Sequence, residues 1–163
     1  MRRLWGVLII IILSIIQTLP QLKIYGFSPD LLMILIIYYS FKVGTTKGII
    51  FSAIIGALVD ILSGSIIGTH VIAFSTIALS IEIFKTIFIF EMPLTVPIVS
   101  FISTITKYLI LFLLSVIFGS ISLGEWYIAM FIEGALNFIF AFPMVWVSKK
   151  IVSLLHREYS MVV

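Results

Sequence analysis

The stretch from residue 48 to residue 68 most constrains the fold, because small or polar residues recur in it at every fourth position. These residues are Gly48, Ser52, Gly56, Asp60 and Gly64, here called the small-residue stripe. On an α-helix, residues four apart are neighbours on one side. Most of the intervening residues are Ile, Leu, Val, Phe or Ala. The stretch therefore predicts a helix that lies in lipid and lets another helix approach its backbone closely along the stripe.

Composition places the whole chain in the membrane. Of its 163 residues, 62% are hydrophobic and 10% are charged, whereas soluble domains average about 45–50% apolar and about 25% charged residues. We therefore expect an all-α integral membrane protein. The chain has no cysteine, which excludes disulfides, thiolate metal sites and thiol nucleophiles. Its basic residues occur singly or in pairs, so nothing indicates nucleic-acid binding.

The apolar runs predict six transmembrane helices in one domain, residues 1–163. Their expected bounds are about 4–19, 29–42, 48–62, 69–90, 94–118 and 125–147. At the start of the second helix we expect Ser28 as N-cap, Pro29 at the first helical position and Asp30 in the first turn. That helix would rise about 21 Å against a hydrocarbon core of about 30 Å. It must therefore borrow length from its flanks or be sheltered by its neighbours.

The basic residues predict the orientation of these six spans. With the amino terminus inside, eight of the ten basic residues fall on the cytoplasmic side: Arg2, Arg3, Lys42, Lys47, Lys85, Lys149, Lys150 and Arg157. Lys23 lies in an outer loop and Lys107 within a span. Because positive charge favours the cytoplasmic side, we expect both termini in the cytoplasm. We also expect the basic turn at residues 42–47 and its counterparts to contact anionic lipid.

Polar residues inside the predicted spans are costly and are therefore informative. Lys107 in the fifth helix and Glu133 in the sixth would lie at similar depth if the two helices are antiparallel neighbours. Asn137 shares the face of Glu133. The favoured interpretation is a buried polar pair that holds the two helices in register. The alternative is a proton or ion relay.

Asp60 lies near the outer end of the third helix, ten residues before His70. We expect it to accept hydrogen bonds from the turn at residues 63–65 and so to close a hairpin; recognition of a partner or ligand is the alternative. Asp60 and His70 are too few ligands for a metal site. No HExxH, GxSxG or Walker sequence is present. The sequence therefore predicts neither an enzyme nor a cofactor site.

Three features together resemble the MreD family of bacterial rod shape-determining membrane proteins. The first is Ser28-Pro29-Asp30-Leu31-Leu32 at the start of the second helix. The second is the G-x-x-x-D-x-x-S-G-S-x-x-G element from Gly56 to Gly68. The third is a last helix that contains Asn137 and Pro143 and ends in basic residues. The positions that match the family pattern are Pro29, Asp30, Gly56, Asp60, Ser63, Gly64 and Gly68.

The resemblance implies a non-enzymatic scaffold of the cell-elongation machinery. Such a subunit would bind MreC and, through it, act with MreB, RodA and a class B penicillin-binding transpeptidase in shape control and peripheral peptidoglycan synthesis. The family's six-helix fold is thought similar to the substrate-binding S components of energy-coupling-factor vitamin transporters. Within this picture, Gly48, Ser52 and Gly56 would either fix the internal bundle, which we favour, or dock a partner's transmembrane helix.

The sequence also leaves open two hypotheses from other functional classes. One is an S component that captures a vitamin. Those proteins are similar to one another in an A-x-x-x-A face on the first helix, which residues 8–16 lack. The other is a small channel or exporter that uses Lys107 and Glu133.

Overall fold

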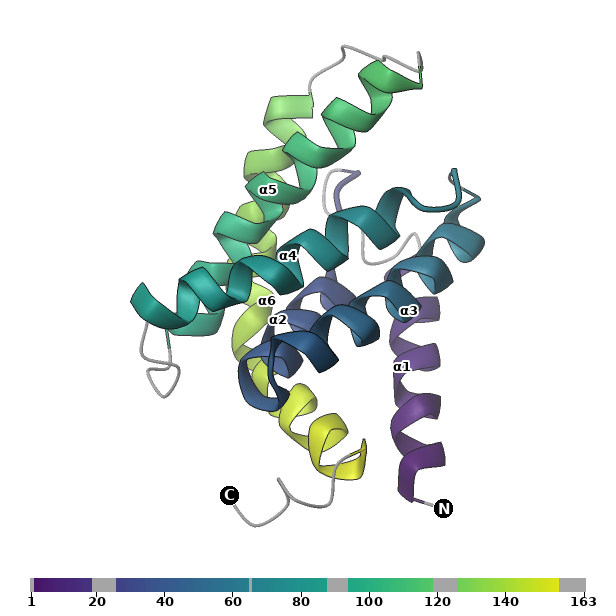
Figure 1. Cartoon of the computed structure of the whole chain (residues 1–163), viewed down its shortest axis with the longest axis vertical. Coiled ribbons are helices and arrows are strands. Elements are labelled where there is room, and N and C mark those ends of the chain that lie inside the picture. Colours follow the sequence, from purple (N-terminus) through teal and green to yellow (C-terminus); the bar gives the residue numbers. More distant parts are fainter. Residues whose placement is uncertain (1, 19–25, 65, 88–93, 119–125, 156–163) are drawn as a thin grey trace.

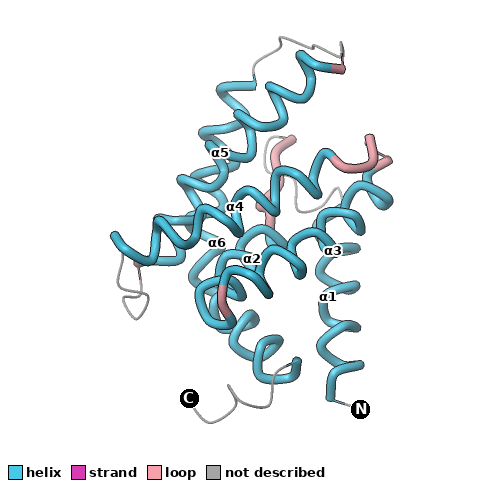
Figure 2. The backbone as a smooth tube through the Cα atoms, in the orientation of Figure 1, coloured by secondary structure: helices cyan, strands magenta, loops and turns pink. Residues whose placement is uncertain are grey.

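The computed structural model describes residues 2–18, 26–64, 66–87, 94–118 and 126–155. In these residues the chain forms six α-helices (Figures 1 and 2). The helices are α1 (Arg2–Thr18), α2 (Leu31–Val43), α3 (Thr45–Ser63), α4 (Thr69–Ile87), α5 (Thr95–Ile117) and α6 (Trp126–Leu155). The all-helical prediction is confirmed.

Four of the six helices, α3 to α6, are long and apolar enough to cross a membrane. The apolar part of α1, Leu4–Gln17, and the whole of α2 are shorter. The chain is therefore built as a membrane protein, with two short apolar helices beside four long ones.

The centre of the bundle is α2 rather than the helix that carries the small-residue stripe. All residues of α2 except Lys42 are buried, so its neighbours shelter this short helix on every side. Its N-cap is Asp30, whose Oδ1 accepts a hydrogen bond from the Met33 N–H at 3.1 Å. The expectation that Ser28 caps the helix is therefore wrong, and the helix begins two residues later than expected.

The connection between α2 and α3 is a single residue, Gly44. Its φ of +105° is a conformation that L side chains rarely adopt, so glycine suits this position. The predicted six-residue basic turn is wrong, because Lys42 belongs to the last turn of α2 and Lys47 to the first turn of α3. The tight link brings Gly48 of α3 against Ser40 of α2.

The α6 helix is the longest and continues well past the predicted end at residue 147. Lys149 and Lys150 are exposed on it, but Ser148, Ile151 and Val152 are buried. The last turn reaches the start of α1, where Leu155 lies beside Gly6. The first turns of α1 and the last turns of α6 thus lie at the same end of the molecule (Figure 1).

Two helix pairs dominate the long elements. Figure 1 shows α3 beside α4, and α5 beside α6. The pairs diverge from the end where α4 finishes and α5 begins, and the α5–α6 pair extends beyond the rest of the bundle (Figure 1). The buried residues of α5 run from Thr95 to Lys107, and those from 108 to 117 are partly or fully exposed.

Candidate functional site

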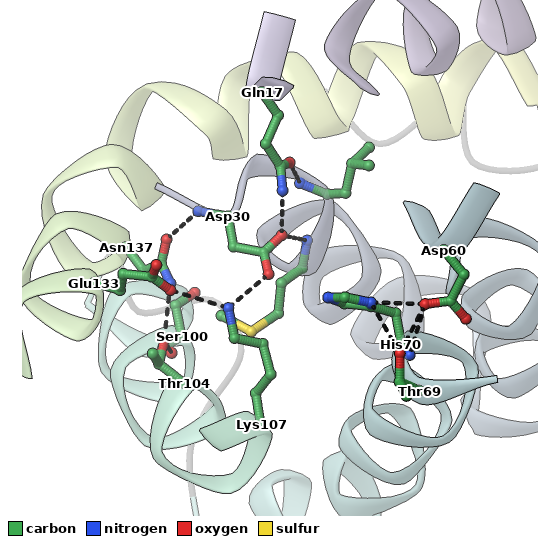
Figure 3. Close-up of polar contacts among 12 residues, drawn as sticks. Gln17, Asp30, Asp60, Thr69, His70, Ser100, Thr104, Lys107, Glu133 and Asn137 are labelled. Carbon is green, nitrogen blue, oxygen red and sulfur yellow. Dashed lines mark hydrogen bonds and ion pairs between the residues drawn. The ribbon is translucent and has the colours of Figure 1, made fainter. Parts of the chain in front are cut away.

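The first candidate site is a group of polar side chains buried where α1, α2, α5 and α6 meet, here called the four-helix junction (Figure 3). At its centre, Lys107 Nζ lies 3.1 Å from Asp30 Oδ2 and 3.1 Å from Glu133 Oε2. The side chains of Lys107 and Asp30 are almost fully buried, and that of Glu133 is 17% exposed. One ammonium group thus bridges two carboxylates from different helices.

Amide side chains complete the junction. Gln17 Nε2 of α1 donates to Asp30 Oδ1 at 3.1 Å, and its Oε1 accepts from the Leu32 N–H at 3.2 Å. On the opposite side, Asn137 Oδ1 accepts from the Asp30 N–H at 2.6 Å. Asn137 Nδ2 donates to Thr104 Oγ1 at 2.8 Å. Gln17 therefore ties α1 to the start of α2, and Asn137 ties α6 both to the start of α2 and to α5.

The junction is chemically suited to holding helices rather than to leaving a reactive group free. Lys107 is shared by two acids, and Asp30 accepts from Lys107, Gln17 and Met33. Buried ions are tolerated when they are paired and hydrogen-bonded in this way. The arrangement fixes the start of α2 against three neighbouring helices.

Sequence reasoning placed Lys107 beside Glu133, and the structure brings these two side chains together. It missed Asp30 and Gln17 as members of the same group. Two signals could have found them. Gln17 is a polar residue near the end of a long apolar run. Asp30 is a further acidic residue beside an apolar helix, and no basic partner was predicted for it.

The second candidate site is the contact of Asp60 with the start of α4 (Figure 3). Asp60 Oδ2 accepts from the Gly68 N–H at 2.7 Å, and Oδ1 accepts from the His70 N–H at 3.1 Å. Oδ1 also accepts from Thr69 Oγ1 at 3.0 Å and lies 2.7 Å from His70 Nδ1. The carboxylate therefore binds the N–H of Gly68, directly before the next helix, and that of His70 in its first turn, which has no partner within that helix.

This geometry adds donors from residues 68–70 to those expected for Asp60. The expected donors were in the turn at residues 63–65, of which Ser65 lies outside the described residues. Ser63 donates from Oγ to the Asp60 backbone carbonyl at 3.5 Å. The hairpin is nevertheless closed by this carboxylate. Among the described residues, no group of three metal-ligating side chains is present.

Four of the five residues of the small-residue stripe, all except Gly64, are buried inside the molecule. A Cβ at Gly48 would lie 2.3 Å from Ser40 Oγ of α2. A Cβ at Gly56 would lie 2.6 Å from the Val71 Cα of α4. Ser52 lies between them, 3.4 Å from Ser75 Oγ. All three residues are buried, so α2 and α4 occupy the face that could otherwise have received a partner.

The remaining predicted positions have local roles. Gly64 is exposed and ends α3 in the left-handed conformation, with φ of +66°, so its expected place in the packed stripe is wrong. Gly68 has φ of +108° and leads into α4. Pro29 is buried directly before the cap of α2.

Comparison with known proteins identifies the chain. Searches of curated proteins and of solved structures gave no match. The family model described as rod shape-determining protein MreD matches residues 1–154. That match covers all six helices except the last residue of α6. The chain therefore belongs to the MreD family of rod shape-determining proteins.

Proposed function

We propose that this protein is a non-enzymatic membrane scaffold of the cell-elongation complex, which binds MreC and helps to control cell shape and peripheral peptidoglycan synthesis. The observation that carries the proposal is the MreD family match over residues 1–154. The polar groups agree with it, because both candidate sites use their charged side chains to join helices. Through MreC, the protein would act with MreB, RodA and a class B penicillin-binding transpeptidase.

In this proposal the protein lies in the bacterial cytoplasmic membrane with both termini in the cytoplasm. Six spans in an S-component-like bundle would place eight of the ten basic residues inside. The four long apolar helices support a place in a membrane, and the shared end of α1 and α6 supports two termini on the same side of it (Figure 1). Exposed Lys47, Lys149 and Lys150 would then contact anionic lipid, each contributing about 1 kcal/mol near the surface.

The packing of α3 limits where MreC can bind. Gly48, Ser52 and Gly56 are already covered by α2 and α4. A partner's transmembrane helix must therefore use a lipid-facing surface of the bundle. The small-residue stripe contributes to the scaffold indirectly, by fixing the shape of the molecule that MreC meets.

Depletion in a rod-shaped host tests the proposal. Cells that lose the protein should become round, and re-expression should restore rods. Tagged protein, extracted in mild detergent, should retain MreC in a pull-down, whereas an extract without the tagged protein should not. Rods that persist after complete depletion, together with no recovery of MreC, would contradict the proposal.

The Gly56→Leu variant adds a structural test in the same host. The new side chain would meet the backbone of α4, so the protein should fail to accumulate, and cells should round as they do on depletion. Western blotting of membranes measures the amount of protein. Normal accumulation with normal MreC binding would show that close packing at Gly56 is dispensable for the scaffold.

A further inference from the structure

One side of α6 is left uncovered by the bundle. The helix contacts α1, α2 and α5 with its buried side. On the opposite side, exposed residues recur at spacings of three, four or seven, which places them along one side of a helix. They are Ile128, Ala135, Ile139, Phe142 and Trp146, here called the outer face of α6. Apolar exposure alone suits lipid as well as a partner, so a second observation is needed.

A proline interrupts the backbone hydrogen bonds of α6 on this side. Pro143 is exposed and lies well inside the helix. Proline has no backbone N–H, so the carbonyl of Ile139, four residues earlier, loses its usual helical donor. Pro97 of α5 has no such effect, because the bonds at the start of that helix begin with the Ile98 N–H and the Leu94 carbonyl, 3.0 Å apart. The Ile139 carbonyl is therefore an acceptor that its own helix leaves unused.

No neighbouring group on α6 replaces the missing donor. Residues 126–155 are α-helical throughout, so the N–H groups on either side of the proline bond to other carbonyls. Elsewhere in the chain, hydroxyl side chains donate to carbonyls three or four residues earlier, as Thr76 does to Ile72. The positions that could act in this way on the Ile139 carbonyl are occupied by Phe142 and Pro143, and neither side chain has a donor.

The unused carbonyl lies in the apolar part of the helix. Ile139 precedes the exposed Lys149 by about 15 Å of helix rise, which is about half the thickness of the hydrocarbon core. Lipid chains have no hydrogen-bond donor, and an unpaired carbonyl in hydrocarbon is costly. Since Ile139 is 60% exposed, a donor from outside the bundle can reach this surface. The outer face therefore favours a partner that carries a polar side chain at this depth.

We propose that the outer face of α6 docks a partner's transmembrane helix, and that a side-chain donor of that helix binds the Ile139 carbonyl. The inference rests on the proposed function, so the partner is MreC. Ala135 lets the partner's backbone approach, because small residues permit close helix packing in membranes. Phe142 and Trp146 lie on the same face, where their rings provide contact area. The donor is a hydroxyl, amide or indole group, since these are the uncharged side-chain donors.

Photo-crosslinking in a rod-shaped host tests which face meets MreC. Benzoylphenylalanine, a photo-crosslinking amino acid, replaces Ile139 in one strain and Ile54 in another. Ile54 is the matched control, because it is 63% exposed, close to the 60% of Ile139, but lies on α3. After illumination, blotting for both proteins should show a product with MreC from position 139 and none from position 54.

Three variants of the full chain test the carbonyl itself. Pro143→Ala supplies the missing N–H, so the Ile139 carbonyl is bonded within the helix. Phe142→Ser keeps the proline and places a hydroxyl three residues after Ile139, the spacing at which Ser115 donates to the Phe112 carbonyl. Phe142→Ala removes the same ring but adds no donor, so it separates the loss of the ring from the filling of the acceptor.

Recovery of MreC in the pull-down measures the effect of each variant. We expect Pro143→Ala and Phe142→Ser each to retain about threefold to tenfold less MreC than the wild type, the effect of one hydrogen bond between helices in a membrane. Phe142→Ala should retain clearly more than Phe142→Ser. Western blotting of membranes checks that the proteins accumulate equally. Should Pro143→Ala fail to accumulate, the two Phe142 variants decide the outcome alone.

Other outcomes overturn the inference. Equal retention of MreC by Phe142→Ala and Phe142→Ser would show that the carbonyl is not used. A product at position 139 that joins two copies of this chain, without MreC, would make the outer face a contact between copies. If the wild type retains MreC but position 139 gives no product with it, the docking face is wrong and the scaffold proposal stands. If the wild type retains no MreC, both proposals fail.

Discussion

Asp30 illustrates why single residues in this protein are hard to assign from local sequence. Ser28-Pro29-Asp30 has the pattern of an N-cap followed by a helical start, and the pattern does mark the beginning of α2. The cap falls on Asp30 because distant residues hold it there. Its N–H donates to Asn137, and its side chain binds Gln17 and Lys107. Contacts from α1, α5 and α6 therefore decide a position that local propensities leave open.

At Asp60 the prediction concerns stability. Asp60→Ala removes the acceptor for two backbone N–H groups at the start of α4, and these groups are poorly placed to find another. We expect a loss of about 1–3 kcal/mol in the free energy of unfolding. Asp60→Asn should lose less, because the amide oxygen still accepts. Denaturant titration of the purified protein in mild detergent measures both.

The control for this prediction is Ser63→Ala. Ser63 is exposed, and its bond to the Asp60 carbonyl is long, at 3.5 Å. Its removal should leave the unfolding midpoint nearly unchanged. An Asp60→Ala protein as stable as Ser63→Ala would show that the N–H groups of α4 do not depend on the carboxylate.

Among the elements, the helices with long apolar runs were predictable, whereas their ends and contacts were less so. The periodicity at residues 48–60 indicated a close-packed helix face, and that face is buried in α3. The periodicity could not specify which helices cover this face of α3. The predicted end of α6 was wrong because Lys149 and Lys150 resemble a helix end. Buried Ser148 before these lysines and buried Ile151 and Val152 after them continue the packed face.

The glycines of the helices give a prediction at this scale. Alanine at Gly56 would place a Cβ 2.6 Å from the Val71 Cα, which is backbone and cannot move without shifting α4. Alanine at Gly134 would meet the ring of Phe101 at 3.1 Å, and a side chain can adjust. We therefore expect Gly56→Ala to cost about 1–3 kcal/mol and Gly134→Ala clearly less.

Unfolding midpoints of the two alanine variants, measured side by side in one detergent, check this order. The same substitution on two helices makes each the control for the other, since both exchange glycine for alanine within a helix. A Gly134→Ala protein that is less stable than Gly56→Ala would contradict the packing of α3 on α4.

For the whole molecule, the orientation in the membrane gives the clearest prediction. The connector after α3 lies at the opposite end from the last turns of α6 (Figure 1). In intact cells, a membrane-impermeant maleimide should label Ile67→Cys, and it should label Lys150→Cys only after permeabilisation. The absence of native cysteine removes background from the protein itself. Labelling in the reverse order would invert the proposed topology.

The burial of every α2 residue except Lys42 also bears on how a newly made chain enters the bilayer. A helix of 13 residues rises about 20 Å, so it falls short of the hydrocarbon thickness on its own. It cannot be integrated as an independent segment and then wait for its neighbours. Since α3, α4, α5 and α6 all follow it in order of synthesis, α2 must stay beside the insertion machinery or α1 until these later helices enclose it.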